Sequence, residues 1–139
     1  VTKIEDGRFN FVIAISVLAH FSEERTVAWF TELARMIKKG GYILFTTHGY
    51  TSLKKYHDVE KVMAGDRYEF LVQKLGGVGF NFNGFPKTNY NKDLDLDHFG
   101  MTYYTPNWFE RSLGKLFTIE GFLPGRLNNN QDVFVVRKR

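Results

Sequence analysis

The sequence has 139 residues, of which 43% are hydrophobic and 24% are charged, which suits one globular domain with its own core and is too short for two. The formal net charge is +4, and much of the excess lies in a C-terminal Arg-Lys-Arg run, which is typical of a solvated chain end and argues against nucleic acid as a partner. Cysteine is absent, which excludes disulfides and thiolate metal sites. No apolar run approaches the roughly 20 residues that span a bilayer, and the start carries no signal-peptide pattern, so we expect a cytoplasmic protein without a membrane partner.

The first third of the chain predicts a strand, a helix and a second strand. Phe9 to Val17 is nearly all apolar and rich in β-branched residues, as in a strand buried on both faces of a parallel sheet. Ser22 is a good N-cap for the helix, and Gly40 and Gly41 are expected to end it. Tyr42 to Thr47 is the next buried strand. This order predicts a βαβ unit with two parallel, neighbouring strands and a right-handed crossover.

The rest of the chain predicts a more irregular arrangement. We expect a helix over 51–64, its continuation over 67–75 after a break at Gly65, a long loop over 76–91, a short helix over 106–113 capped by Thr105, and strands over 116–122 and 132–136. The intervening PGRLNNNQ is turn material, so the last two strands should form an antiparallel hairpin. We expect residues 1–139 to form a single domain, with 65–104 as a loop-rich excursion or lid.

Three stretches in this order resemble the C-terminal half of a class I S-adenosylmethionine-dependent methyltransferase. DGRFNFVIAISVLAHF (6–21) resembles the lead-in, fourth strand and following loop of that family; ELARMIKKGGYILFTTHG (32–49) resembles its helix end and fifth strand; and QDVFVVRKR (131–139) resembles its closing strand. The sequence departs from the family at Asn10, where Asp is usual, and at Lys39, where Pro is usual. Neither change would disable the fold.

The resemblance implies an α/β fold: a partial doubly wound, Rossmann-like sheet of parallel strands with a C-terminal antiparallel hairpin. The family order places the 132–136 strand between those at 42–47 and 116–122. The resemblance also implies S-adenosylmethionine as cofactor and methyl transfer to a small-molecule or glycan acceptor. The family's Gly-rich loop and ribose-binding acid would precede the matched region. We therefore expect a truncated form that is inactive alone and binds S-adenosylmethionine weakly or not at all.

Two other functions compete with this interpretation. A non-catalytic α/β binding or interaction module would keep the partial fold without the chemistry. Another doubly wound enzyme, such as a nicotinamide dehydrogenase, is disfavoured by the antiparallel final hairpin. The sequence upstream of Val1 would separate enzyme from module, because a Gly-rich strand–helix turn there would indicate the enzyme.

Ligands of open α/β sheets bind outside the carboxyl ends of the parallel strands, which are residues 16–21 and 47–50 here. By resemblance, Ser16, Val17 and His20 would border the cofactor, although His20 could instead hydrogen-bond the loop backbone. His48 ends a buried strand and precedes Gly49, so its side chain would face the cleft. An imidazole there suits acceptor alignment or proton removal, which makes His48 our catalytic candidate. A structural His bonded to loop backbone is the alternative.

Aromatic side chains are dense between residues 80 and 108, where they would line an acceptor pocket or else form core or interface. Tyr103, Tyr104 and His98 are our substrate-binding candidates in this region. Nearby, acids at alternate positions in 93–97 suggest a metal loop, but the EF-hand positions that require Gly and Glu hold His98 and Tyr104. We predict no metal site there, and a half-exposed strand or extended lid instead.

The strand at 11–17 is expected to lie at one edge of the sheet, because the family's first strand, its outer neighbour, would precede this chain. Such an edge presents unpaired backbone N–H and C=O groups, and the residues along it carry no charge. A homodimer through this exposed strand edge is therefore a further expectation.

Overall fold

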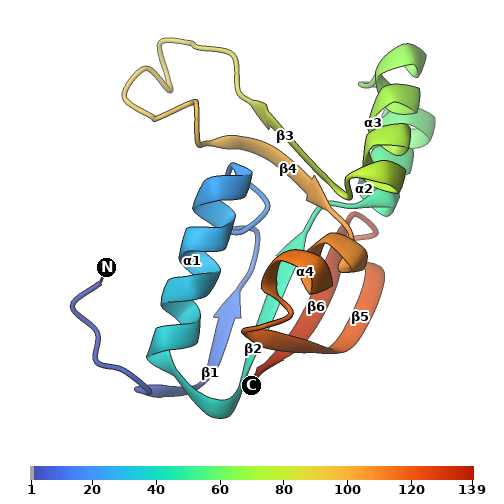
Figure 1. The fold of residues 1–139 in the computed structure, drawn as a ribbon. Coiled ribbons are helices and arrows are strands. Elements are labelled where there is room, and N and C mark those ends of the chain that lie inside the picture. The colour runs from blue at the N-terminus through green and yellow to red at the C-terminus, as the bar shows by residue number, and fades with distance from the viewer. Residues whose placement is uncertain (1) are drawn as a thin grey trace.

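A computed structural model describes residues 2–139 of the chain. Its main sheet has four strands in the order β1 (Phe9–Ala14), β2 (Ile37–Thr47), β6 (Gln131–Lys138) and β5 (Phe117–Leu127), and Figure 1 shows it behind the helices. β1 and β2 are parallel, whereas β6 is antiparallel to both β2 and β5. This confirms the predicted βαβ unit, the final hairpin and the place of the last strand between its two neighbours.

The final hairpin is longer than its sequence predicts. β5 stays paired with β6 as far as Leu127, opposite Gln131, so most of the segment expected to be turn belongs to the strand. The turn itself contains Asn128 and Asn129, whose φ angles are 54° and 48°. Asparagine tolerates this left-handed region better than most residues, which explains why a run of asparagines stands here.

The glycine pair does not end the helix, contrary to our expectation. α1 (Glu23–Met36) begins after Ser22, whose Oγ accepts from the backbone N–H of Arg25, and ends at Met36. β2 starts at once, and Ile37 pairs with Phe9 while the next pair joins Tyr42 to Phe11. Residues 38–41 form an irregularity inside β2, which Gly40 makes possible with a φ of 77°.

The helix predicted over 51–64 is shorter and less regular than expected. α2 (Tyr50–Lys54) runs into a π-helical segment, η1 (Lys55–Val59), and the chain then turns. The backbone N–H groups of Val62 and Met63 both donate to the carbonyl of Tyr56, which folds residues 60–64 back onto η1. The next helix, α3 (Gly65–Gly77), begins at the predicted break.

The segment 65–104 has more regular structure than a loop-rich excursion. Besides α3 it contains a two-stranded antiparallel ladder of β3 (Phe80–Gly84) and β4 (Gly100–Tyr104), so irregular chain is limited to 85–99. Within that loop, residues 93–97 form turns and not the expected extended strand. The short helix α4 (Pro106–Leu113) is as predicted, and the Thr105 side chain accepts from the Trp108 N–H.

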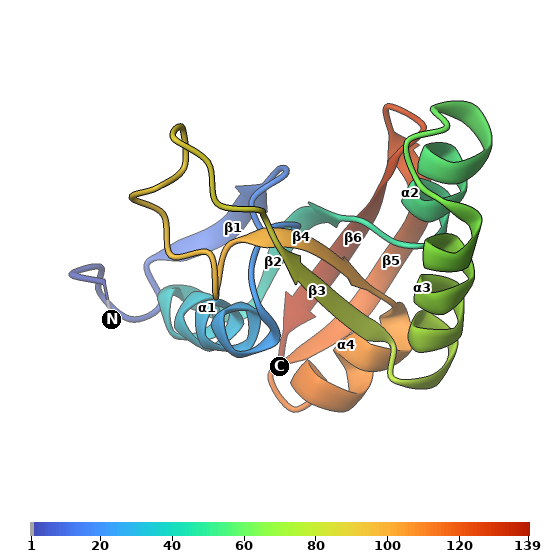
Figure 2. The same ribbon diagram turned by 90° about the horizontal axis from the view of Figure 1, so that it is seen from above.

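The main core lies between the sheet and the two helices α1 and α4, which cover the same face (Figure 2). Phe45 on β2 lies at its centre, with ring centroids 5.0 Å from Phe30 of α1, 5.6 Å from Phe109 of α4 and 4.9 Å from Phe134 of β6. A smaller core joins α2, α3 and β4 through Leu53, Leu71, Leu75 and Tyr103. No helix within 2–139 is long and apolar enough to cross a membrane.

Candidate functional site

β4 crosses the carboxyl ends of the two parallel strands and fastens the segment after β1 (Figure 2). The N–H groups of Gly100 and Thr102 donate to the carbonyls of His20 and Ala19, at 2.8 and 2.9 Å. The Thr102 hydroxyl also donates to the carbonyl of Phe21 at 2.6 Å. This contact fixes the loop in which cofactor-binding residues were predicted, although the sequence did not predict β4 as a strand.

A hydrogen-bonded polar cluster joins the ends of β1, β2 and β6. The hydroxyls of Ser16 and Thr46 donate to Gln131 Oε1, at 2.9 and 2.6 Å, and Thr46 Oγ1 accepts from the Ser16 N–H at 2.8 Å. Since the oxygen of the Gln131 amide takes both hydroxyls, its nitrogen faces His48 Nε2, 3.4 Å away. Ser16 itself has a φ of 56°, a conformation that a non-glycine residue adopts only when its surroundings hold it.

His48 is buried and electrically neutral at physiological pH. Its exposed fraction is 2%, and burial lowers its pKa to about 4, with a smaller contribution from the nearby His20. The Gln131 amide donates to Nε2, so the neutral ring carries its proton on Nδ1. Nδ1 has no hydrogen-bond partner among residues 2–139. The His48 carbonyl accepts from the Tyr104 N–H at 3.1 Å, so β4 is fastened to β2 as well.

His20 and His48 lie together, with ring centroids 6.1 Å apart. His20 Nδ1 lies 2.8 Å from the carbonyl oxygen of Gly100. Because a carbonyl only accepts, Nδ1 carries the proton and Nε2 is left as the acceptor nitrogen. The loop contact that we kept as an alternative for His20 is therefore present, and it orients a half-buried imidazole that lies beside Phe85 and Phe99.

A glycine is needed at position 49 because the Asp132 side chain fills the space beside it, and not because the chain turns there. A Cβ atom at Gly49 would collide with Oδ2 of the Asp132 carboxylate, so no other residue fits without a shift. Asp132 is 3% exposed, and its Oδ1 accepts from the N–H of Gly125 at 2.7 Å. Burial raises the Asp132 pKa to about 6, while the bonds from Gly125 and Thr51 oppose the rise.

The end of β1 offers one apolar wall to a nucleoside-type cofactor. Ile15 and Val17 are 46% and 48% exposed and follow β1, the strand that has no neighbour on its outer side within 2–139. Ser16 between them keeps its hydroxyl on Gln131. Residues 15–21 contain no acidic side chain to take ribose hydroxyls. Two exposed apolar side chains are what this segment offers a cofactor, and the rest of a site would have to come from another segment.

A pocket of about 420 Å³ lies among η1, the turn after it, the start of α3 and β4. We call it the Tyr103 pocket. It is lined by Tyr56, Val62, Met63, Ala64, Arg67, Met101 and Tyr103. Its volume falls within the range of small-molecule sites, about 300–1,000 Å³. The rings of Tyr56 and Tyr103 stand between the pocket and His48, with centroids 6.2 and 5.5 Å from the imidazole. His48 is not itself among the lining residues, so the pocket is linked to the polar cluster only through these two rings.

The three substrate-binding candidates lie in different environments. Tyr103 lines the Tyr103 pocket. Tyr104 is fully buried against Phe80 and Trp108 in the main core, so its side chain supports β4 and is not part of the Tyr103 pocket. His98 lies at the start of α1, where its Nδ1 is 2.7 Å from the Ser22 hydroxyl. Of the three side chains, the structure thus brings only the Tyr103 ring against the His48 imidazole, while Tyr104 contacts His48 through its backbone.

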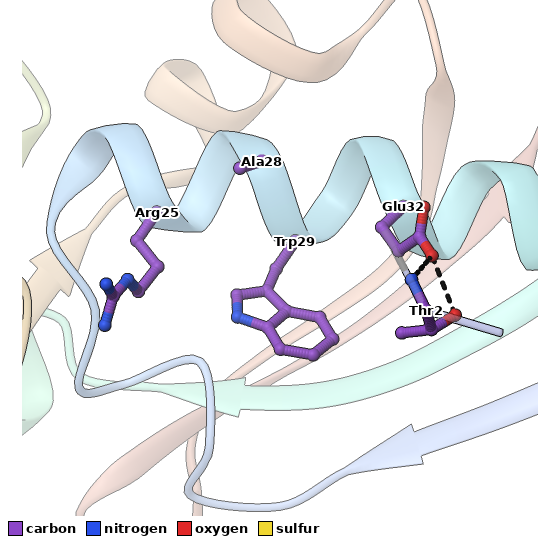
Figure 3. A pocket seen from close by; sticks show the side chains of 5 residues that line it. All are labelled: Thr2, Arg25, Ala28, Trp29 and Glu32. Carbon is purple, nitrogen blue, oxygen red and sulfur yellow. Dashed lines mark hydrogen bonds between the residues drawn. The ribbon is translucent and has the colours of Figure 1, made fainter.

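A second hollow, of about 240 Å³, runs along α1 and is drawn in Figure 3; it is lined by Thr2, Arg25, Ala28, Trp29 and Glu32. Glu32 is already occupied, since it accepts from the Thr2 N–H and hydroxyl at 2.7 and 2.8 Å. Trp29 stacks on Phe21, with centroids 6.3 Å apart. The hollow lies along the helix and away from the polar cluster, so we do not treat it as the functional site. Within residues 2–139, no three His, Asp or Glu side chains gather as a metal site.

Comparison with known proteins identifies the fold. Residues 1–45, which contain β1, α1 and most of β2, match the family model for a methyltransferase domain. No curated protein matches the chain significantly. A solved structure of a Pyrococcus horikoshii OT3 protein superposes with a TM-score of 0.57 at 16% identity, covering 100% of this chain and 56% of that one. The fold is that of the class I S-adenosylmethionine-dependent methyltransferases.

Two further solved structures agree. A SAM-dependent methyltransferase from Methanosarcina mazei gives a TM-score of 0.57 at 16% identity, covering 99% of this chain and 63% of its own. An S-adenosylmethionine dependent methyltransferase from Mesorhizobium loti gives 0.54 at 11% identity, covering 99% and 65%. The chain therefore spans less than two thirds of the length of these structures. The comparisons support S-adenosylmethionine as cofactor and confirm the resemblance seen in the sequence.

Sequence reasoning found the two histidines but missed three residues that shape the site. In the sequence, Gln131 and Asp132 only mark the start of the closing strand. In the structure, Gln131 contacts His48 and Asp132 lies against Gly49. A buried polar pair at the start of an otherwise apolar strand is the signal that would have indicated them. Arg67 gave no signal, because its place in the Tyr103 pocket depends on the turn after η1.

Proposed function

We propose that the intact protein transfers a methyl group from S-adenosylmethionine to a small-molecule or glycan acceptor, and that this chain is its C-terminal portion. The match of the β1–α1–β2 unit to the methyltransferase domain carries the proposal. It is supported by the polar cluster and pocket at the carboxyl ends of β1 and β2, where ligands of such sheets bind. We also keep the cytoplasm as the proposed location.

In this proposal the two histidines have separate tasks. S-adenosylmethionine supplies a methyl group activated by its sulfonium, so the chain's own residues have to orient the acceptor and manage its proton. Ser16, Val17 and His20 would border the cofactor, and the Nε2 of His20 is available to accept a proton. His48 would act from the acceptor side, through the Tyr56 and Tyr103 rings that it supports.

Substituting His48 tests its role in a form of the protein that includes sequence upstream of Val1. We expect His48→Ala to lower turnover about 10-fold or more while changing the affinity for S-adenosylmethionine less than about 3-fold, because His48 supports the acceptor side. The measurements are S-adenosylhomocysteine release at saturating donor and acceptor, and calorimetric titration of the donor. Unchanged turnover would make His48 structural only.

The cofactor itself tests the proposed function. We expect the 139-residue chain to bind S-adenosylmethionine weakly or not at all in titration calorimetry, because its residues supply only one wall. The form extended upstream of Val1 should bind at micromolar concentration. If the extended form does not bind, the proposed function fails; if the short chain binds as tightly, our account of the site is wrong.

One observation favours a second function, a non-catalytic interaction module. The sheet face opposite α1 and α4 carries apolar side chains that are about half exposed, among them Phe11 at 50% and Ile13 at 60%. An apolar surface of this kind is characteristic of protein association. A homodimer through the β1 edge is the simplest arrangement that we propose for it. Absence of cofactor binding by the extended form would support the module over the enzyme.

A further inference from the structure

The Tyr103 pocket is apolar on most of its sides. Tyr56 comes from η1, Met101 and Tyr103 come from β4, and the turn after η1 supplies Val62 and Met63. π-Helical segments such as η1 are rare and often occur at functional sites. Two aromatic rings and several aliphatic or thioether side chains line the pocket, a surface that suits a flat apolar body.

Arg67, at the start of α3, is the one cationic side chain in the lining. It is exposed, and it makes no ion pair with any acidic side chain in residues 2–139. Its guanidinium lies 5.9 Å from the centroid of the Phe70 ring, which orients the group without neutralising it. The lining thus carries one positive charge with no partner.

Three acids near Arg67 in the sequence already have partners. Asp58 is 2.7 Å from His57 Nδ1, and Glu60 lies 3.4 Å from the Lys55 ammonium. The Asp66 carboxylate accepts from the backbone N–H of Arg67 at 2.8 Å, at the helix N-terminus. Each of these acids has a partner other than the guanidinium, which leaves Arg67 open to an external anion.

Tyr103 adds a second polar group beside Arg67. Its ring is 3% exposed, and burial, followed by the neighbouring Tyr56, raises the pKa of its hydroxyl above the usual range, although Arg67 opposes the rise. The hydroxyl therefore stays protonated and can donate. The Tyr56 hydroxyl, by contrast, accepts from the Asn130 amide at 3.2 Å.

We propose that the Tyr103 pocket binds a small molecule with a flat apolar body and one carboxylate, which Arg67 and the Tyr103 hydroxyl hold. A guanidinium matches a carboxylate with two parallel hydrogen bonds, and the apolar walls bury the rest of the ligand. Two lining side chains, Tyr56 and Tyr103, are the rings that lie beside His48, and on this ground we assign the ligand as the methyl acceptor. That last step rests on the proposed function, whereas binding of a carboxylate in the pocket does not.

The test compares an acid with its neutral isostere on the 139-residue chain. The probes are 3-phenylpropionate and 3-phenylpropionamide, titrated by NMR at low salt and near pH 7. We expect the acid to bind at least 10-fold more tightly and to shift the Met101 methyl and Tyr103 ring signals. In the Arg67→Gln variant, the affinity for 3-phenylpropionate should fall to the affinity for 3-phenylpropionamide. Arg126→Gln, which removes the same charge at an exposed position of β5, should change neither.

A second variant separates the contribution of the hydroxyl. Tyr103→Phe keeps the wall and should weaken the acid about 3-fold or more without affecting the amide. The proposal is overturned if acid and amide bind equally, if Arg67→Gln leaves the acid unchanged, or if neither probe binds at millimolar concentration. No methyl donor is present in these titrations, so their result is independent of whether the extended protein binds S-adenosylmethionine.

Discussion

Two buried titratable side chains, His48 after β2 and Asp132 on the neighbouring β6, make the stability of the fold depend on pH in opposite directions. The folded protein lowers the pKa of His48 from 6.5 to about 4, so its contribution to stability is present above pH 6.5 and is lost as the pH falls towards 4. The folded protein raises the pKa of Asp132 from 3.8 to about 6, so its contribution is present below pH 3.8 and is lost as the pH rises through 6. Between pH 4 and 6 the two slopes oppose each other.

Single substitutions should expose each slope. In Asp132→Asn we expect the free energy of unfolding to rise more steeply with pH between 4 and 6 than in the wild type, by up to about 1.4 kcal/mol per pH unit. In His48→Asn it should fall with pH relative to the wild type over the same interval. Urea unfolding at pH 4, 5, 6 and 7 measures both. The double variant is the control and should lack both effects; wild-type slopes in both single variants would contradict the assignment.

For single residues, the sequence predicts where a side chain lies along an element better than it predicts which side chains contact it. The place of His48 at the end of a buried strand followed from an apolar run and a glycine. Gln131, which contacts His48, and Asp132, which lies against Gly49, are more than 80 residues away, and only the pairing of β2 with β6 brings them to this place. Tyr104 was a reasonable pocket candidate, but β4 alternates its side chains, so that Tyr103 and Tyr104 face different cores.

The β3–β4 ladder is the element on which the site depends most. Thr102→Val deletes the hydroxyl that donates a hydrogen bond to the Phe21 carbonyl. We expect it to lower the free energy of unfolding by about 0.5–1.5 kcal/mol. Hydrogen exchange at the Gly100 and Thr102 amides should speed up. The same substitution at Thr118, half-buried on β5, is the control. If exchange at both amides is unchanged, the ladder is held by other contacts.

Elements with a strong local pattern were predictable and the others were not. The β1–α1–β2 unit and α4 have apolar periodicity and N-caps at Ser22 and Thr105, so their sequences predict the elements, although not the point where α1 gives way to β2. β3 has the sequence FNFNG, which reads as loop, and it becomes a strand only because β4 pairs with it. The end of η1 likewise depends on Lys61, which adopts a φ of 55° without a glycine to indicate a turn.

The whole molecule has one covered sheet face and one bare face within residues 2–139. α1 and α4 pack on the first, and Figure 2 shows no helix of the described chain on the second over β1 and β2. Alternate residues of β1 and the segment after it point to the bare face: Phe11, Ile13, Ile15 and Val17 are all about half exposed or more. In β2, Tyr42 lies beside Phe11 and is 41% exposed. The apolar surface thus continues across strands.

This surface adjoins an open edge, because β1 pairs only with β2 among residues 2–139. An apolar edge strand without charge is a template for pairing with a second copy. We therefore expect the 139-residue chain to sediment as a dimer at micromolar concentration. Ile13→Lys should give a monomer, because it places a charge at the most exposed apolar position of β1, at little cost to the fold.

Val59→Lys is the matched control for this association. Val59 is 71% exposed on η1, away from the sheet, so the same change of side chain should leave the dimer intact. Sedimentation velocity of the three proteins at one concentration decides between edge pairing and a covered edge. Edge pairing also slows exchange of β1 amides that face away from β2, and the Ile13→Lys variant should lose this protection. A wild-type monomer whose β1 amides exchange slowly would mean that the edge is covered from within the chain, and the dimer would then be excluded.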